Sequence, residues 1–163
     1  MAARRTRLWQ GEEGELASSA ATNNEEHLGT YATSPNRVKE DVANEKQIYE
    51  GGYAGRQVFE LVQNAADAAR IAGVDGRIEL FLSKTGSLYC ANTGEPLTAD
   101  GLTALQFNRL SPKTNQDVEL IGRFGVGFKS LLAVTKSPAI FSRTGSVLFD
   151  SDRAEEEIRS RVP

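Results

Sequence analysis

The chain has 163 residues, of which 39% are hydrophobic and 25% charged, and its formal net charge is −3 at pH 7. These values describe an ordinary soluble chain long enough for one sizeable core, and they give no electrostatic reason to expect nucleic acid or a membrane surface as partner. The only cysteine, Cys90, and the only histidine, His27, exclude a disulfide framework and a cysteine cluster and argue against a histidine-ligated zinc site or a serine–histidine triad.

The first 26 residues mix charge with alanine, serine and asparagine and show little periodicity, so we predict a largely disordered tail there. No hydrophobic segment follows the first basic residues, as it would in a secretory signal, and no apolar run is long enough to span a bilayer. The expected compartment is the cytoplasm, and residues 27–163 are expected to form one domain.

The rest of the chain alternates between helical and strand-like patterns. Helices are predicted over residues 37–49, 55–72, 98–106, 128–134 and 152–161, and strands over residues 77–83, 87–91, 139–143 and 146–149. Residues 108–118 are polar and aperiodic, which indicates a loop. This order predicts an α+β fold, a two-layer sandwich with helices on one face of a mostly antiparallel sheet.

The helix predicted over residues 55–72 carries a polar stripe within the sequence ELVQNAADA. Glu60, Asn64 and Asp67 are spaced by four and then three residues, which places them on one helix face. Their neighbours are apolar enough to hold the helix against a core, so the stripe must meet solvent, a ligand or a metal. Taken alone, an amphipathic helix with a solvated face explains the pattern equally well.

Two glycine-containing segments follow. GRFGVGFKS, residues 122–130, places three glycines before an apolar helix, which suits a phosphate-binding loop but also a tight turn that serves only packing. It is neither a P-loop, because Phe128 separates the last glycine from Lys129, nor a dinucleotide fingerprint, because its glycine spacing differs. NTGEP, residues 92–96, follows a predicted strand; taken alone it is more simply a turn than a base-binding loop.

The order ELVQNAADA, NTGEP, GRFGVGFKS, with a polar loop between the last two, resembles the GHKL superfamily of ATPases. Its members include gyrase-type topoisomerases, ninety-kilodalton heat-shock chaperones, histidine kinases and MutL-type repair proteins. The segments YEGGYAGRQVFELVQNAADA and IGRFGVGFKSLLAVTKSPAIFSR look closest to sacsin-type ATP-binding domains. The resemblance covers about residues 30–150 and implies a Bergerat-type ATP-binding fold.

The resemblance implies a role for each matching residue. Glu60 matches the general base that activates the attacking water, and Asn64 matches the amide that ligates Mg²⁺, a cation that prefers oxygen ligands. The remaining matches line the nucleotide. Those near the base and Asn64 are Asp67, Ala68, Asn92 and Gly94. Those around the phosphates are Gly122, Gly125, Val126, Gly127, Phe128 and Lys129. Residues 108–121 match the lid, from which Lys113 would reach a phosphate. Lys129 is equally compatible with a solvent-facing helix position.

The chain also departs from the family pattern. Asn92 stands where the family usually has aspartate, so an uncharged group that both donates and accepts would face the base. Pro96 replaces a glycine, and the family's later strand segment has no match before Pro163, so the chain is expected to be a truncated version of the domain.

We therefore expect Mg²⁺-dependent ATP binding with slow hydrolysis, serving as the nucleotide switch of a chaperone-like protein, with a protein client or neighbouring domain and ATP-dependent dimerisation as implied partners. The alternatives are a non-catalytic nucleotide sensor or interaction module, and a kinase-type phosphotransferase.

Overall fold

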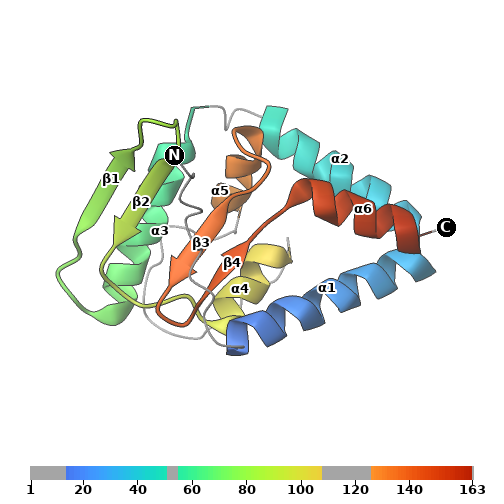
Figure 1. The fold of residues 1–163 in the computed structure, drawn as a ribbon, viewed down its shortest axis with the longest axis horizontal. Helices are drawn as coiled ribbons and strands as arrows, with labels where there is room; N and C mark the ends of the chain where they lie inside the picture. Colours follow the sequence, from blue (N-terminus) through green and yellow to red (C-terminus); the bar gives the residue numbers. More distant parts are fainter. Residues whose placement is uncertain (1–13, 51–54, 108–125, 163) are drawn as a thin grey trace, which may run out of the picture.

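The computed structural model describes residues 14–50, 55–107 and 126–162. Figure 1 shows two β-hairpins lying side by side over a layer of helices, with α1, α2 and α6 at one end. The elements run in the order α1 (Glu15–Thr33), α2 (Asn36–Glu50), α3 (Gln57–Ala72), β1 (Ile78–Leu82), β2 (Leu88–Asn92), α4 (Ala99–Gln106), α5 (Val126–Lys129), a 3₁₀ turn (Ser130–Ala133), β3 (Ala139–Ser142), β4 (Gly145–Leu148) and α6 (Ser151–Arg161). The predicted α+β class is confirmed.

The strands form two separate hairpins instead of one continuous sheet. β1 pairs antiparallel with β2, and β3 pairs antiparallel with β4, and within the described residues neither hairpin is hydrogen-bonded to the other through its strands. The helix starts follow the sequence closely, because Thr98 caps α4 through Gly101 N and Asp150 caps α6 through Arg153 N. The expected helix over residues 128–134 is shorter: one α-turn passes into the 3₁₀ turn.

The prediction of a disordered tail through residue 26 is wrong from residue 15 onward, where α1 begins. The inward positions of α1 follow a helical period, but most of them carry polar or small side chains. Leu16 and Leu28 are buried, and so is Asn23, with 7% of its surface exposed. A helix whose inward stripe includes a buried asparagine and a half-buried histidine has little hydrophobic periodicity, which is why the pattern did not reveal it.

Asn23 is held in a hydrogen-bond network between α1 and α4. Its Nδ2 donates to Thr103 Oγ1 at 3.0 Å and to Gln106 Oε1 at 2.7 Å. Gln106 Nε2 in turn donates to Asn24 Oδ1 at 3.2 Å. These bonds replace the hydrogen bonds to water that the amide loses on burial. Because they join specific residues of the two helices, they also fix the register of α1 against α4.

Replacing Asn23 with alanine is expected to lower the free energy of unfolding by about 1–3 kcal/mol, because it leaves buried acceptors without their donor. Urea denaturation measures this loss. Asn44→Ala is the matched control, since Asn44 is an exposed helical asparagine on α2 and its replacement is expected to change stability by less than about 0.5 kcal/mol. Equal stability of the two variants would mean that α1 does not pack as described.

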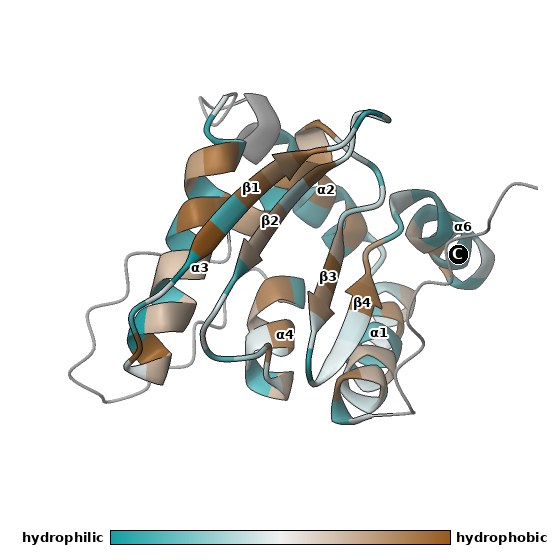
Figure 2. Cartoon of the chain, turned by 60° about the vertical axis from the view of Figure 1, so that its left-hand side comes forward, coloured by the Kyte–Doolittle hydropathy of each residue, from teal (hydrophilic) through white to brown (hydrophobic). Residues whose placement is uncertain are grey.

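The β1–β2 hairpin is more exposed than its alternating sequence suggests. Only one face of this two-stranded ribbon packs on α3, and within the described residues no further strand pairs with the outer edge of β1. The ribbon is strongly apolar in Figure 2. Five of its large apolar side chains are at least 45% exposed: Leu80, Phe81, Leu82, Leu88 and Tyr89. The predicted half-burial of this strand therefore holds only for Ile78.

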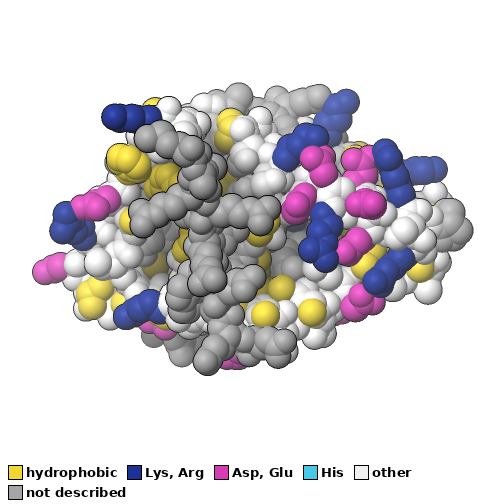
Figure 3. Space-filling model, in the orientation of Figure 1, with side chains coloured by type: hydrophobic (Ala, Val, Ile, Leu, Met, Phe, Trp, Pro, Cys, Tyr) yellow, Lys and Arg dark blue, Asp and Glu magenta, His cyan; other side chains and the backbone are white. Residues whose placement is uncertain are grey.

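Charged pairs cover the end of the molecule formed by α6, where Lys, Arg, Asp and Glu side chains intermix in Figure 3. Two pairs lie within α6, Arg153 with Glu157 and Arg159 with Glu155, and Lys136 pairs with Asp152 at the start of the helix. One pair ties α6 to α1: Arg161 donates to both carboxylate oxygens of Glu25 at 2.9 and 2.8 Å. Exposed pairs of this kind add little stability. None of the helices in the described part of the chain is long and apolar enough to cross a membrane.

Candidate functional site

α3 carries the predicted polar stripe on one unbroken helix. It ends at Gly73, which adopts a left-handed conformation (φ 63°) and donates its amide to the carbonyls of Ala69 and Arg70. Along the stripe, Glu60 in the first turn is half-buried, Asn64 is exposed and Asp67 is 8% exposed. The stripe is therefore not a purely solvated face, because Asp67 is buried and Glu60 is partly buried.

The NTGEP segment lies directly against α3. Gly94 has φ +154°, and a Cβ atom at this position would lie 2.7 Å from the backbone carbon of Ala68 and from the nitrogen of Ala69. The next amide, Glu95 N, donates to Ala68 O at 2.9 Å. Only glycine permits this approach, so the structure brings two of the predicted residues, Ala68 and Gly94, into contact.

The strand end before Gly94 is fixed by Thr93. Arg77 N donates to Thr93 Oγ1 at 2.8 Å, and Thr93 N donates back to Arg77 O at 3.0 Å. Asn92, the last residue of β2, is exposed. Its carboxamide is therefore open to a ligand at the same end of the strand where Gly94 meets α3.

The end of the third motif also packs on α3. Contacts join α5 to α3 and to α4. Phe128 is 8% exposed, and its ring meets that of Phe149 with centroids 4.8 Å apart. Of the other predicted phosphate-loop residues, Val126 and Gly127 form the first turn of α5, whereas Gly122, Gly125 and Lys113 lie outside the described residues.

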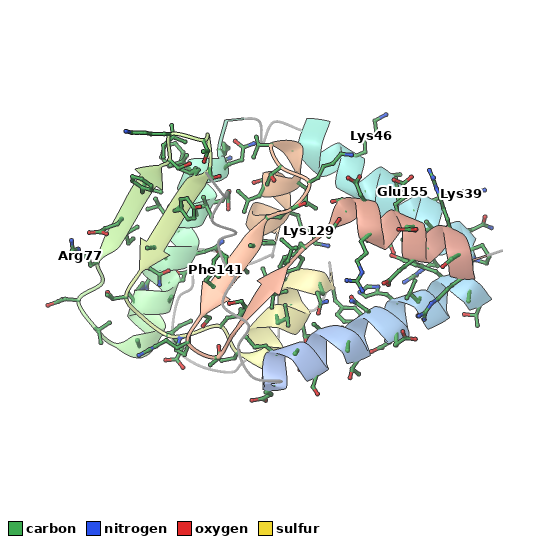
Figure 4. The ribbon with its side chains drawn as sticks, viewed as in Figure 1. Lys39, Lys46, Arg77, Lys129, Phe141 and Glu155 are labelled. Atoms are coloured by element: carbon green, nitrogen blue, oxygen red, sulfur yellow. The ribbon has the colours of Figure 1, made fainter. Side chains whose placement is uncertain are left out.

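Lys129 does not face solvent, so that alternative for its position is wrong. Its side chain is in the interior near α4 (Figure 4), and it is only 8% exposed. Its Nζ donates to Gln106 O at 3.5 Å, at the carbonyl end of α4, where a cation is favoured by the helix dipole.

The ring of His27 lies next to this charge. It stacks on Phe107 with centroids 4.1 Å apart. Burial, together with the ammonium of Lys129, lowers the pKa of His27 below its usual 6.5, although Asp41 and Glu26 act in the opposite direction. The neutral form of His27 is therefore favoured, and its ring packs between α1 and the end of α4.

A dedicated protein cage for a metal is absent from the described residues, where no three His, Cys, Asp or Glu side chains cluster closely enough to hold an ion. Mg²⁺ does not need such a cage, because it usually keeps several waters and takes one or two protein ligands plus the phosphates of its substrate. The exposed carboxamide oxygen of Asn64 fits that requirement.

Sequence reasoning missed three residues that touch the candidate site. Ser142, the last residue of β3, and Arg143 and Thr144, in the turn to β4, hydrogen-bond to the segment from Gly94 to Leu97. Their partners lie 45 to 49 positions away in sequence, so no local pattern could reveal the contact. The only signal was the hairpin turn itself.

Comparison with known proteins finds similarity to a bacterial chaperone. The chain is 30% identical to the chaperone protein HtpG of Shewanella sp. (strain ANA-3) over 133 residues, covering 61% of this chain and 21% of the relative. It is 31% identical to HtpG of Shewanella denitrificans over 118 residues, covering 56% and 18%. No family model and no solved structure matches.

The chain spans about a fifth of the length of these curated relatives. The matched stretch of 133 residues is longer than the 61% of this chain that it covers, so the relatives carry residues inside the match that have no counterpart here. The similarity supports a relationship to this chaperone.

Proposed function

We propose that the chain is a GHKL-type nucleotide-binding module, nearest to the sacsin-type domains, that binds ATP with Mg²⁺ and hydrolyses it slowly. One observation carries the proposal: two segments far from α3 in sequence both pack on it. α3 supplies the polar stripe, the segment after β2 packs Gly94 on Ala68, and α5 packs on the same helix. The similarity to HtpG agrees with the chaperone branch of that superfamily.

In this proposal each residue does what its position allows. Glu60, half-buried in the first turn of α3, would orient a water molecule and accept its proton as the water attacks the γ-phosphorus. The bond from that phosphorus to the β–γ bridging oxygen breaks in the same step, and ADP leaves with the electron pair. Asn64 offers its amide oxygen to Mg²⁺, which when bound neutralises phosphate charge. Phosphoryl transfer asks a protein mainly for positioning and charge neutralisation, so few residues are needed.

The base would lie beside the contact between α3 and the loop after β2. Asp67, Ala68 and Gly94 would line it, and Asn92 would read its edge. Because a carboxamide both donates and accepts, Asn92 permits adenine and does not reject guanine as an aspartate would.

The phosphates would lie at the N-terminal side of α5, against Gly122, Gly125, Val126, Gly127 and Phe128, and Lys113 and Lys129 would supply positive charge to them. We further propose that the module acts in the cytoplasm as the nucleotide switch of a chaperone-like protein, with a client or neighbouring domain and ATP-dependent dimerisation.

Calorimetric titration with ATP, in the presence and absence of Mg²⁺, together with a phosphate-release assay, tests the proposal. Saturable Mg²⁺-dependent binding with slow release of phosphate is expected. Binding without release would instead favour a non-catalytic nucleotide sensor. A chain that is folded by circular dichroism and binds no ATP at millimolar concentration would contradict both.

A further inference from the structure

The β3–β4 turn reaches across to the loop that follows β2. Leu97 N donates to Ser142 Oγ at 3.0 Å, and Thr144 Oγ1 donates to Leu97 O at 2.6 Å. Arg143 Nη2 donates to Gly94 O at 3.3 Å. Three consecutive residues, the last of β3 and the two of the turn, therefore bond to the backbone of a loop that is more than 40 positions away in sequence.

The two hydroxyls also bond to each other, with their oxygens 3.0 Å apart. The Thr144 hydroxyl has one proton and uses it on Leu97 O, so the Ser142 hydroxyl must be the donor in this pair. The result is a closed ring: Leu97 N–H donates to Ser142, Ser142 to Thr144, and Thr144 to Leu97 O. In such a ring each bond polarises the next, so losing one hydroxyl weakens the others.

The opposite side of the loop is fixed by α3. Glu95 N donates to Ala68 O at 2.9 Å, and Gly94 is in van der Waals contact with the backbone of Ala68. The loop from Gly94 to Leu97 is thus held between the polar-stripe helix on one side and the β3–β4 turn on the other.

The turn of the β1–β2 hairpin has a similar sequence, but its serine bonds within the turn. This turn, Ser83-Lys84-Thr85-Gly86, repeats the pattern serine, basic residue, threonine, glycine found at Ser142-Arg143-Thr144-Gly145. Ser83 Oγ likewise lies 2.9 Å from Thr85 Oγ1, but Ser83 Oγ accepts from Ser87 N, within its own turn. The same motif is local in one hairpin and bridging in the other.

We propose that Ser142, Arg143 and Thr144 are positioning residues of the nucleobase-binding loop. We call these three residues and their hydrogen bonds to the loop the clamp. The identity of the ligand rests on the proposed function, whereas the clamp rests on the hydrogen bonds alone. By fixing Gly94 O and both backbone groups of Leu97, the turn preorganises the loop against α3, so that a purine nucleotide does not have to order the loop when it binds.

Thr144→Val tests the clamp, because it keeps the shape of the side chain and removes the hydroxyl. Hydrogen exchange of the Leu97 amide, measured without nucleotide, is expected to be about fivefold faster. The reason is that its acceptor, Ser142 Oγ, is no longer held by the Thr144 hydroxyl. ATP affinity is expected to fall about fivefold for the same reason. Thr85→Val is the matched control and should change neither quantity, whereas Thr144→Ser should restore both.

The two readouts separate the failure of the clamp from the failure of the proposed function. If wild type binds ATP and Thr144→Val behaves as Thr85→Val in exchange and affinity, the clamp is wrong and the nucleotide site stands. If exchange at Leu97 quickens but affinity is unchanged, the positioning role is wrong. If wild type binds no ATP while exchange still quickens, the proposed function fails and the clamp remains as a structural contact.

Discussion

Gly94→Ala is expected to lower the free energy of unfolding by about 3 kcal/mol or more and to abolish ATP binding. The added methyl group would lie 2.7 Å from two backbone atoms of α3, which cannot move aside as a side-chain tip can. The φ angle of +154° adds strain for any residue with a Cβ atom. The loop would have to leave α3, and with it the surface on which the base is proposed to rest.

Gly86→Ala is the control that separates the cost of a positive φ angle from the cost of a steric clash with the added methyl group. Gly86 also has a positive φ, +86°, but its Cβ would meet nothing within 4 Å. This variant is expected to lose only about 1 kcal/mol and to keep its ATP affinity. Urea denaturation and ATP titration of both variants measure the difference, and equal losses in the two would mean that Gly94 is not pressed against α3.

Glu60→Gln is expected to reduce phosphate release by about 100-fold or more while ATP affinity changes less than about threefold. Glutamine keeps the size and hydrogen-bonding capacity of the side chain, but at neutral pH its amide cannot take the proton of the attacking water. Single-turnover phosphate release on enzyme saturated with Mg²⁺ and ATP measures the chemical step apart from binding.

Glu79→Gln provides the control for the loss of one negative charge. Glu79 is exposed on β1, its side chain pairs with that of Arg77, and it has no role in the proposed nucleotide site. The Glu79→Gln variant is expected to release phosphate at the wild-type rate. A Glu60→Gln variant that still turns over at the wild-type rate would remove Glu60 from the chemistry and leave the sensor interpretation.

Local chemistry made much of the fold predictable. Thr98, Asp150 and Gly73 each act on neighbouring backbone groups, so their capping roles could be predicted from sequence. The predicted hairpins are both present, because alternation and turn residues are also local signals. The contact of Gly94 with Ala68 could be expected only through the resemblance, since no spacing rule connects residues in a loop and a helix.

Long-range contacts account for what the sequence did not reveal. Asn23 is buried because Thr103 and Gln106, 80 and 83 positions away, satisfy its amide. Read alone, an asparagine indicates a surface or a tail. The interior position of Lys129 has the same cause, because the carbonyl end of α4 offsets a charge that its own helix would leave in solvent.

Binding of ATP to wild type and to Asn64→Ala, with and without Mg²⁺, tests the central claim most directly. Asn64 is exposed, so its replacement should leave the melting temperature close to that of the Asn44→Ala control. We expect Mg²⁺ to tighten ATP binding about tenfold or more in wild type and in Asn44→Ala, and to have little effect in Asn64→Ala. ATP binding that Mg²⁺ strengthens equally in all three proteins would contradict the assignment of Asn64, and folded wild type that binds no ATP would contradict the nucleotide site itself.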